Sequence, residues 1–382
     1  MKSKIQKLLP ILLVLMMLLA SCGGSSEDST TETPEASTDE TTEEVASNTT
    51  AAAAEPEFTF TIVYPGPLGD KSFADSAHRG VERAIAELGV KGIEIETQSI
   101  AEHETALRGA VAGNPNMVLP LALDAQLTID IANENPNILF GAPSDVFADT
   151  LPENMAAFTI NVHESSFLAG LIAGSLTSTK IVGAAVGGEA PSLNQFFYGY
   201  KQGVLEVCSD CQVLVTYMGF NFNDPALGLE TALDQYERGA DIVYQIAGRT
   251  GEGVLQAAAQ TGNYAIGVDS NQDFVQPGNV IVSMIKRVDV TTYKLIESAK
   301  NGTFQGGFFE LGMEDGAAGI SWDEGSTYFE DNGPADMVAK IPAIKDLVEQ
   351  YRTDILDGTY VVCDALADAN LETDVCSALK ES

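Results

Sequence analysis

From residue 58 onward, apolar stretches of two kinds alternate along the chain. Short continuous runs are typical of buried strands, and runs with apolar residues every three to four positions are typical of amphipathic helices. The expected strands are 58–64, 93–100, 117–123, 137–142, 180–186, 212–217, 241–246, 264–268 and 280–285. The expected helices are 72–88, 104–112, 125–135, 164–176, 193–207, 226–238, 253–260, 291–301 and 336–356. This alternation predicts two α/β lobes with parallel sheets covered by helices on both faces.

The chain begins with a pattern that resembles a bacterial lipoprotein signal peptide. Lysines precede an apolar run at 8–20, which is too short to span a bilayer comfortably, and Leu19-Ala20-Ser21-Cys22 follows it. This resemblance implies that residues 1–21 are an export signal and that Cys22 carries a lipid and becomes the new N-terminus. An ordinary secretory signal with a chance cysteine is the alternative.

Residues 22–57 have a different composition from the rest of the chain. They are rich in Ser, Thr, Glu, Asp, Ala and Pro, and contain no Lys or Arg. Such a segment cannot bury enough apolar surface to offset its ordering entropy. We therefore expect a disordered acidic tether that holds residues 58–382 close to a membrane.

The net charge of the chain is −35, with 55 acidic and 20 basic residues spread along its length. Such a charge disfavours a polyanionic partner, and nucleic acid in particular. Solubility or a saline habitat explains the acidity without a specific cationic partner, although such a partner remains an alternative.

Four cysteines follow Cys22, and their number favours disulfides in an exported protein. The simplest pairing is local, Cys208 with Cys211 and Cys363 with Cys376, but the other two connectivities remain open. A redox-active Cys-x-x-Cys pair normally opens a helix, whereas Cys208 and Cys211 lie between a helix pattern and a strand pattern. The three histidines have no zinc-ligand spacing with these cysteines, so we expect no metal site.

No common catalytic or nucleotide-binding motif is present, so we expect neither an enzyme nor a cofactor. Three positions near strand ends are candidates for ligand contact. Gly248 opens a glycine-rich loop whose N–H groups can face a polar ligand, or form a plain turn. Asp70 is placed to cap a helix, and Phe73 either stacks on a flat ligand or belongs to the core.

Short motifs occur in one characteristic order between residues 58 and 320. They are Asp70-Lys71-Ser72-Phe73, Glu164-x-x-Phe167-Leu168-Ala169-Gly170, Tyr217-x-Gly219-x-x-Phe222-x-Asp224-Pro225, Gly239-Ala240-Asp241, Gly267-Val268-Asp269-x-x-Gln272 and Ser283-x-x-Lys286-x-x-Asp289. Together they resemble the BMP (basic membrane protein) family of substrate-binding lipoproteins, which includes purine nucleoside receptors.

The resemblance implies a type I periplasmic-binding-protein fold, in which two Rossmann-like lobes close on a ligand by hinge motion. We place lobe 1 at about 58–162 plus 267–320, and lobe 2 at about 163–266 plus 321–382. The family resemblance also implies delivery of the ligand to an ABC permease, and we expect a monomer.

The resemblance further assigns roles to individual residues. Phe73 and an aromatic residue of the other lobe would enclose a purine, with Phe222 as the first choice and Phe197 as the second. Asp269 and Lys286 would engage ribose hydroxyls, which carboxylates and ammonium groups can both bind.

Several alternatives remain at this predicted site. Asp145 is a further candidate contact. The alternatives are that Asp269 caps a turn and that Lys286 is a solvated strand residue paired with Asp289. The chain departs from the family at Tyr64-Pro65-Gly66 and at Ala74, where purine-binding members usually have polar residues. These departures leave recognition of the base without identified partners.

The leading hypothesis is a lipid-anchored receptor on the extracytoplasmic face of the cell membrane. It would bind a purine or other nucleoside for an ABC importer. A receptor of the same fold for a sugar, free base or signalling molecule is one alternative. A surface lipoprotein with an adhesive or enzymatic role is another.

Overall fold

The computed structural model describes residues 57–380. The predicted signal peptide at 1–21, the lipid site Cys22 and the predicted tether up to residue 56 lie outside the described residues. Within residues 57–380, no helix has both the length and the apolar character needed to cross a membrane.

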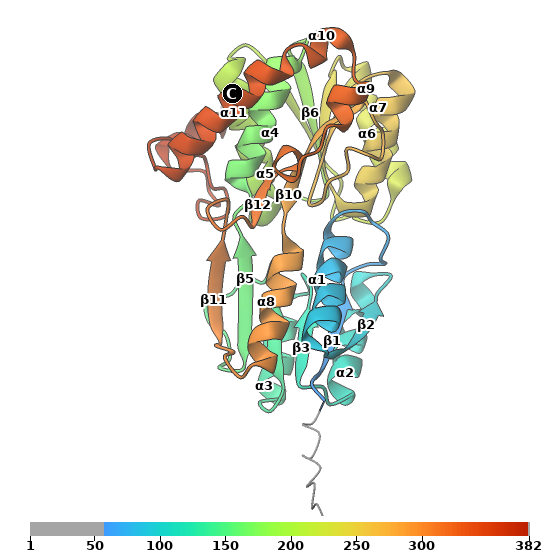
Figure 1. The fold of residues 1–382 in the computed structure, drawn as a ribbon, viewed down its shortest axis with the longest axis vertical. Helices are drawn as coiled ribbons and strands as arrows, with labels where there is room; N and C mark the ends of the chain where they lie inside the picture. Colours follow the sequence, from blue (N-terminus) through green and yellow to red (C-terminus); the bar gives the residue numbers. More distant parts are fainter. Residues whose placement is uncertain (1–56, 381–382) are drawn as a thin grey trace, which may run out of the picture. The chain divides into compact units, whose positions relative to one another are not determined.

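The described residues form two lobes, each built around a six-stranded sheet (Figure 1). The strand order is β11-β5-β4-β3-β1-β2 in lobe 1 and β12-β10-β9-β8-β6-β7 in lobe 2. All neighbouring strands are parallel except β12, which runs antiparallel to β10. The strands are β1 (Thr59–Tyr64), β2 (Lys91–Glu96), β3 (Met117–Pro120), β4 (Leu139–Ala142), β5 (Met155–Ile160), β6 (Ile181–Val186), β7 (Gln212–Tyr217), β8 (Ile242–Ile246), β9 (Tyr264–Gly267), β10 (Val280–Lys286), β11 (Gly307–Leu311) and β12 (Ala318–Ile320).

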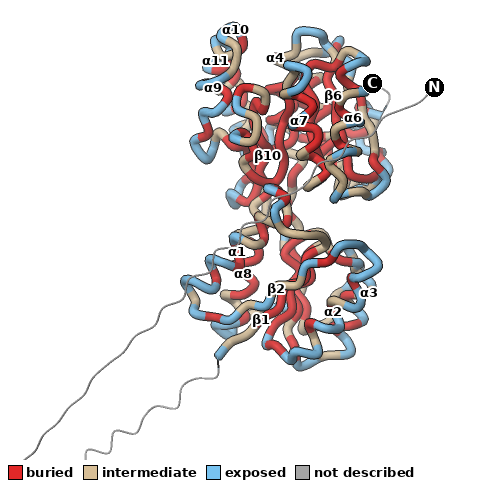
Figure 2. The backbone as a smooth tube through the Cα atoms, turned by 90° about the vertical axis from the view of Figure 1, so that its right-hand side faces the viewer, coloured by how far each residue is buried: buried red, intermediate tan, exposed pale blue. Residues whose placement is uncertain are grey.

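Helices cover the sheets and confirm the α/β prediction. Figure 2 shows that buried residues are concentrated along the strands and the inward faces of the helices. The α-helices are α1 (Phe73–Leu88), α2 (His103–Ala112), α3 (Ala125–Glu134), α4 (His163–Leu176), α5 (Pro191–Val207), α6 (Pro225–Glu237), α7 (Gly251–Thr261), α8 (Val288–Lys300), α9 (Tyr328–Asn332), α10 (Ala335–Val338), α11 (Ile341–Leu356) and α12 (Asp374–Lys380). Short 3-10 helices are η1 (Ile100–Glu102), η2 (Gly248–Thr250) and η3 (Ser321–Glu324).

The chain passes between the lobes three times, after β5, after β10 and after β11. The exit from β5 leads into lobe 2, and the exit from β10 leads into lobe 1. Because the parallel strands of one sheet share a direction, the carboxyl ends of both sheets face the opposite lobe. In Figure 1 the arrowheads of β5 and β11 point toward lobe 2 accordingly. This edge is where parallel α/β sheets bind ligands.

The predicted boundary between the lobes at residue 267 is wrong. β9 and β10 belong to the sheet of lobe 2, and so does β12, whereas β11 completes the sheet of lobe 1. Lobe 1 therefore comprises about 57–160 and 288–311, and lobe 2 about 163–286 and 318–380. A buried strand has the same apolar pattern in either sheet, so the sequence did not show which sheet β10 joins.

The sequence pattern missed three strands and merged two helices. β5, β11 and β12 lie in stretches where no strand was expected, and the residues of β11 alternate between exposed and half-buried at a sheet edge. The helix expected at 336–356 divides into α10 and α11. Pro342 in the first turn of α11 has no N–H to donate, so it begins a new helix instead of continuing the first.

Helices α4 and α5 of lobe 2 touch through their backbones. A Cβ atom added to Gly170 would lie 2.1 Å from the carbonyl oxygen of Tyr200. A Cβ atom added to Gly203 would lie 2.0 Å from the carbonyl oxygen of Phe167. Only glycine permits this approach, which fixes the position of α5 on the lobe.

We predict that Gly203→Ala destabilises the protein by about 1–3 kcal/mol, because the added methyl group must push α5 away from α4. Gly109→Ala is the matched control, since no atom other than its chain neighbours and the nearby backbone of helix α2 lies within 4 Å of the Cβ position at Gly109. There the same substitution should stabilise the helix by about 0.5–1 kcal/mol. Urea unfolding of both variants measures the difference, and equal stabilities would contradict the assigned role of the α4–α5 contact.

Candidate functional site

A buried lysine ammonium lies at the point where the chain leaves lobe 2 for lobe 1. Lys286 ends β10, and its side chain is 4% exposed. Its Nζ atom lies 3.1 Å from Oδ1 and 2.9 Å from Oδ2 of Asp145, which follows β4 in lobe 1. The alternative pairing of Lys286 with Asp289 is wrong, because Asp289 binds Arg287 through both carboxylate oxygens.

Two phenylalanine rings flank the Lys286 ammonium. Its Nζ atom lies 5.2 Å from the ring centroid of Phe73 and 5.6 Å from that of Phe196. Phe73 is the first residue of α1 in lobe 1, and Phe196 lies in the second turn of α5 in lobe 2. These distances suit cation–π attraction. The two lobes therefore contribute an aromatic face each, close to one ion pair.

Asp269 lies beside this group, just after β9, and is 6% exposed. Its Oδ2 atom accepts a hydrogen bond of 2.6 Å from Ser72 Oγ, and its carbonyl oxygen accepts one of 3.0 Å from the Lys286 N–H. Burial raises the pKa of the Asp269 carboxyl to about 6. The positive charge of Lys286 and the Ser72 hydroxyl act to lower this pKa, whereas the charges of Asp70 and Asp145 raise it further.

The loop that precedes α1 docks directly on lobe 2. Ser270 Oγ donates a 3.0 Å hydrogen bond to the carbonyl oxygen of Ser72, and Gln272 Nε2 donates one of 3.1 Å to that of Lys71. The Lys71 ammonium forms a 2.7 Å ion pair with Glu252 in the first turn of α7. The Asp70-Lys71-Ser72-Phe73 motif therefore links the lobes as well as placing one aromatic ring.

Asp70 has a structural role in this loop. Its carboxylate oxygens accept hydrogen bonds from the N–H groups of Ser72, Ala74 and Asp75, at 2.9, 2.9 and 3.1 Å. Burial raises the pKa of the Asp70 carboxyl, and these N–H groups act to lower it. Both oxygens are therefore engaged by the start of α1. Asp70 has a capping role, although the N-cap position itself is Ser72 and not Asp70.

The structure does not bring Phe222 or Gly248 to the Lys286 group. Phe222 is 41% exposed, and its ring covers Gly187, where an added Cβ would lie 2.2 Å from Cε1. Gly248 lies next to the backbone of Phe222 and opens η2. Within residues 57–380, no ring contact or hydrogen bond joins either residue to Lys286. Phe222 and Gly248 lie next to each other at the carboxyl ends of β6, β7 and β8.

Phe196 is the residue that sequence reasoning missed. The second choice, Phe197, packs instead against Tyr198 and Tyr217, with ring centroids 5.0 and 6.4 Å away. A signal for Phe196 exists in the repetition of the two lobes. Phe73 lies nine residues after the end of β1, and Phe196 lies ten residues after the end of β6, the corresponding central strand of the other sheet.

Two serines at the site were also not predicted. Ser72 binds Asp269 as described, and Ser144 lies next to Asp145 in the chain. The Ser144 hydroxyl is fully buried, and it has no hydrogen-bond partner among the described residues. The sequence does not show that either serine lies at the site, because their positions depend on how the loops of the two lobes meet.

The four cysteines form the two local disulfides, Cys208–Cys211 and Cys363–Cys376. The first lies just after α5, and the second closes the C-terminal segment around α12. In the part of the chain that the structure describes, no three or more His, Cys, Asp or Glu side chains gather in a group suited to a metal ion.

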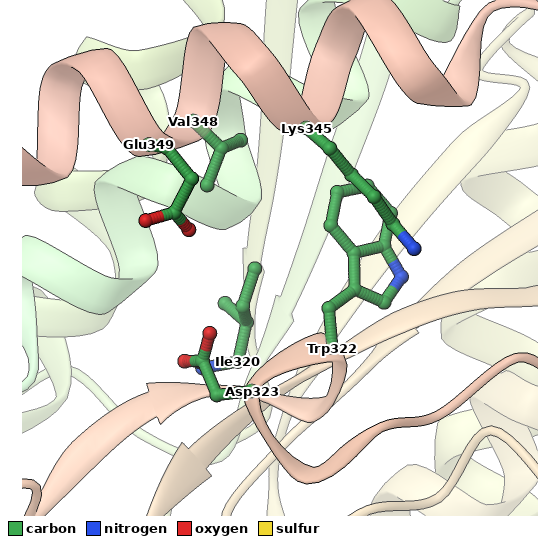
Figure 3. A pocket seen from close by; sticks show the side chains of 6 residues that line it. All are labelled: Ile320, Trp322, Asp323, Lys345, Val348 and Glu349. Atoms are coloured by element: carbon green, nitrogen blue, oxygen red, sulfur yellow. The ribbon is translucent and has the colours of Figure 1, made fainter.

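Two surface cavities lie apart from the Lys286 group. Figure 3 shows the first, a cavity of about 160 Å³ in lobe 2 between η3 and α11, where the indole of Trp322 forms one wall. Its lining residues are Ile320, Trp322, Asp323, Lys345, Val348 and Glu349. The second, of about 280 Å³, lies in lobe 1 against α8. Neither cavity includes the residues that surround Lys286. The candidate site is therefore defined by the side chains that meet at Lys286 and not by a cavity.

Comparison with known proteins agrees with this fold. A model of the Bmp family, described as "ABC transporter substrate-binding protein PnrA-like", matches residues 59–341. Basic membrane protein D of Borreliella burgdorferi (strain JD1) is 30% identical over 276 residues, covering 70% of this chain and 79% of that protein. Basic membrane protein A of Borreliella afzelii is 27% identical over 297 residues, covering 76% of this chain and 91% of that protein.

Solved structures show the same architecture. A solute-binding protein of an ABC transporter system from Aeropyrum pernix K1 has a TM-score of 0.73 and 27% identity, covering 85% of this chain and 98% of that chain. A similar protein from Conexibacter woesei has a TM-score of 0.59 and 22% identity, covering 80% of this chain and 99% of that chain. The predicted type I periplasmic-binding-protein fold is thus confirmed. The family and the fold are those of solute-binding proteins, and the chain belongs to the Bmp family of ABC transporter substrate-binding proteins.

Proposed function

We propose that this protein is the lipid-anchored receptor of an ABC importer and that it binds a purine or other nucleoside between its lobes. The observation that carries the proposal is the Lys286 ammonium, held against Asp145 and flanked by the rings of Phe73 and Phe196. These groups come from both lobes. A ligand placed there would therefore contact both halves of the protein.

The chemistry of these groups suits a molecule with a flat ring and vicinal hydroxyls. Aromatic faces stack on a planar base without requiring charge. The carboxylates of Asp145 and Asp269 accept hydrogen bonds from hydroxyls, and the Lys286 ammonium donates to an oxygen. In this proposal Phe196 takes the role that the family resemblance gave to Phe222.

The crossovers and the interlobe loop support a receptor that opens and closes. In residues 57–380, three chain segments join the lobes, an arrangement that permits hinge motion. The contacts of the Lys71–Ser72 loop with lobe 2 are polar and mostly side-chain mediated, so they can break and re-form. A ligand that favours the closed arrangement shifts the equilibrium by its difference in affinity for the two states.

The proposed location rests on the sequence and on the family. The lipoprotein-like signal sequence that ends at Cys22 and the acidic segment that follows it predict an anchor and a tether on the extracytoplasmic face of the membrane. A receptor held there would remain close to its permease. The relatives named basic membrane proteins are consistent with this location.

The ligand assignment predicts that the full-length chain binds at least one common nucleoside with a Kd well below about 1 mM. Isothermal titration calorimetry against a panel of nucleosides measures this, after unfolding and refolding to remove any ligand that co-purifies. Mass spectrometry of the removed material is the companion measurement. A sugar, a free base or a signalling molecule in place of a nucleoside would sink the nucleoside assignment.

Both aromatic walls should contribute to affinity. We predict that Phe73→Leu and Phe196→Leu each weaken nucleoside binding by about 0.5–1.5 kcal/mol, because leucine keeps an apolar side chain but lacks the π face. Phe308→Leu is the control, since Phe308 is 44% exposed on β11 at the outer edge of the lobe 1 sheet. Calorimetric affinities equal to that of the Phe308 variant would place the base elsewhere.

The Asp269 carboxyl makes the affinity depend on pH. Its pKa of about 6 is raised by burial, so its contribution to folding stability is present below its unfolded pKa and is lost as the pH rises through about 6. Ligand hydroxyls instead favour the ionised form. We therefore predict that nucleoside affinity falls about tenfold between pH 7 and pH 5.

Asp269→Asn is the control for this pH dependence. The amide keeps an acceptor oxygen but does not titrate, so the variant should bind more weakly at pH 7 and show a flatter pH profile. Calorimetry of both proteins at pH 5, 6 and 7 checks the prediction. Parallel profiles for the two proteins would show that another group causes the dependence.

A further inference from the structure

The chain continues past the family match, which ends at residue 341, into a segment that packs on lobe 2. We call residues 357–380 the C-terminal brace. It follows α11, is closed by the Cys363–Cys376 disulfide and ends in α12. In Figure 1 the dark-red end of the chain lies on the side of lobe 2 where α4 and α5 are found.

The C-terminal brace is bound along one stripe of α5. Gln195, Gln202 and Glu206 share this stripe, because residues seven and eleven positions apart lie on nearly the same side of an α-helix. The Cys363 N–H donates a 2.7 Å hydrogen bond to Gln202 Oε1. Tyr360 OH donates one of 2.6 Å to Glu206 Oε2. These bonds fix the brace against the middle and end of the helix.

The bond nearest the ligand site joins Gln195 to Asp364. Gln195 is 2% exposed, and its Nε2 atom donates a 2.6 Å hydrogen bond to Oδ1 of Asp364. The same carboxylate oxygen accepts from the N–H of Leu366 at 2.9 Å, which orients it within the brace. A hydrogen bond to a charged acceptor is stronger than a neutral one, and losing it would leave a buried amide unsatisfied.

Gln195 is followed directly by Phe196, whose ring lies beside the Lys286 ammonium. The first turn of α5 has no side-chain cap, because Ala190 at the N-cap supplies no side-chain hydrogen bond. Asn194 accepts a bond from Tyr217 OH at 2.8 Å, and the α4–α5 glycine contacts hold the helix further along. Among the described residues, the Asp364 bond is therefore one of two side-chain bonds that fix the turns carrying Phe196.

We propose that Asp364 of the C-terminal brace is a positioning residue for the ligand site. Through Gln195 it fixes the first two turns of α5, and with them the place of the Phe196 ring opposite Phe73. The Cys363–Cys376 disulfide holds Asp364 in place from the neighbouring position in the chain. This inference rests on the proposed function, since it concerns the aromatic wall of that site.

The test compares two aspartates of the brace in the full-length chain. Asp364→Ala removes the bond to α5, and Asp364→Asn keeps an acceptor oxygen for Gln195. Asp368→Ala is the matched control, because in the described residues the Asp368 carboxylate accepts from residues of the brace itself, Glu372 and Thr373, and makes no bond to α5. Hydrogen exchange of residues 191–197 without ligand is one readout, and calorimetry with adenosine, guanosine and inosine is the other.

We expect Asp364→Ala to speed exchange at residues 191–197 and to weaken binding of the nucleoside that the wild type binds best by roughly three- to tenfold. Asp364→Asn should restore most of both properties. Asp368→Ala should behave like the wild type in both, even if it lowers the melting temperature as much as Asp364→Ala does. A purely structural role in the brace would not produce this difference.

Equal exchange and equal affinity in Asp364→Ala and Asp368→Ala would overturn the inference. If the wild type binds none of the three nucleosides, the proposed function fails, and exchange at residues 191–197 alone decides whether Asp364 positions this part of α5. Should Asp364→Ala not fold, Gln195→Leu removes the same bond from the helix side. Gln195→Leu should then exchange faster at residues 191–197 than the wild type does. An exchange rate equal to that of the wild type would contradict the proposal.

Discussion

The burial of one positive charge governs how the two lobes meet. An ammonium removed from water costs several kcal/mol unless a counter-charge and hydrogen bonds replace its hydration. Asp145 supplies that counter-charge to Lys286 from the other lobe, although the Asp145 side chain itself remains 26% exposed. The main chain of Lys286 is also held, by Asp269 on its N–H side and by Ser76 on its carbonyl side. The crossover after β10 is therefore anchored to both lobes at the candidate site.

A second constraint on the same site is the packing of α5, the helix that carries Phe196. Glycines bring α4 and α5 into backbone contact, so α5 can be placed in only one way on lobe 2. The position of Phe196 is set by α5. The C-terminal brace also holds α5, through hydrogen bonds to Gln195 and Gln202. Rigid support of this kind is what a binding site needs, because an aromatic wall displaced by a fraction of an ångström loses part of its stacking contact.

The sequence predicted the elements better than their assembly. Apolar periodicity placed nearly every central strand and helix, because burial on a sheet or a helix face leaves a local pattern. It missed β5, β11 and β12 and assigned β10 to the wrong lobe, because membership of a sheet depends on contacts distant in the chain. The same limit applies at the site. Asp145, Asp269, Lys286 and Phe73 do come together. In the described residues Phe222 makes no ring contact with Lys286, and the unpredicted Phe196 flanks the ammonium.

The hydrogen-bonding capacity of Lys286 favours a neutral ligand over an anionic one. An ammonium has three donors, and the two oxygens of Asp145 engage the Lys286 ammonium in the described residues. A ligand oxygen that takes a remaining donor would leave this ion pair intact. An anion would instead compete with Asp145 and would also lie close to Asp269, in a chain whose net charge is −35. Neutral hydroxyls avoid both penalties, and they can also donate to the carboxylates that an anion would repel.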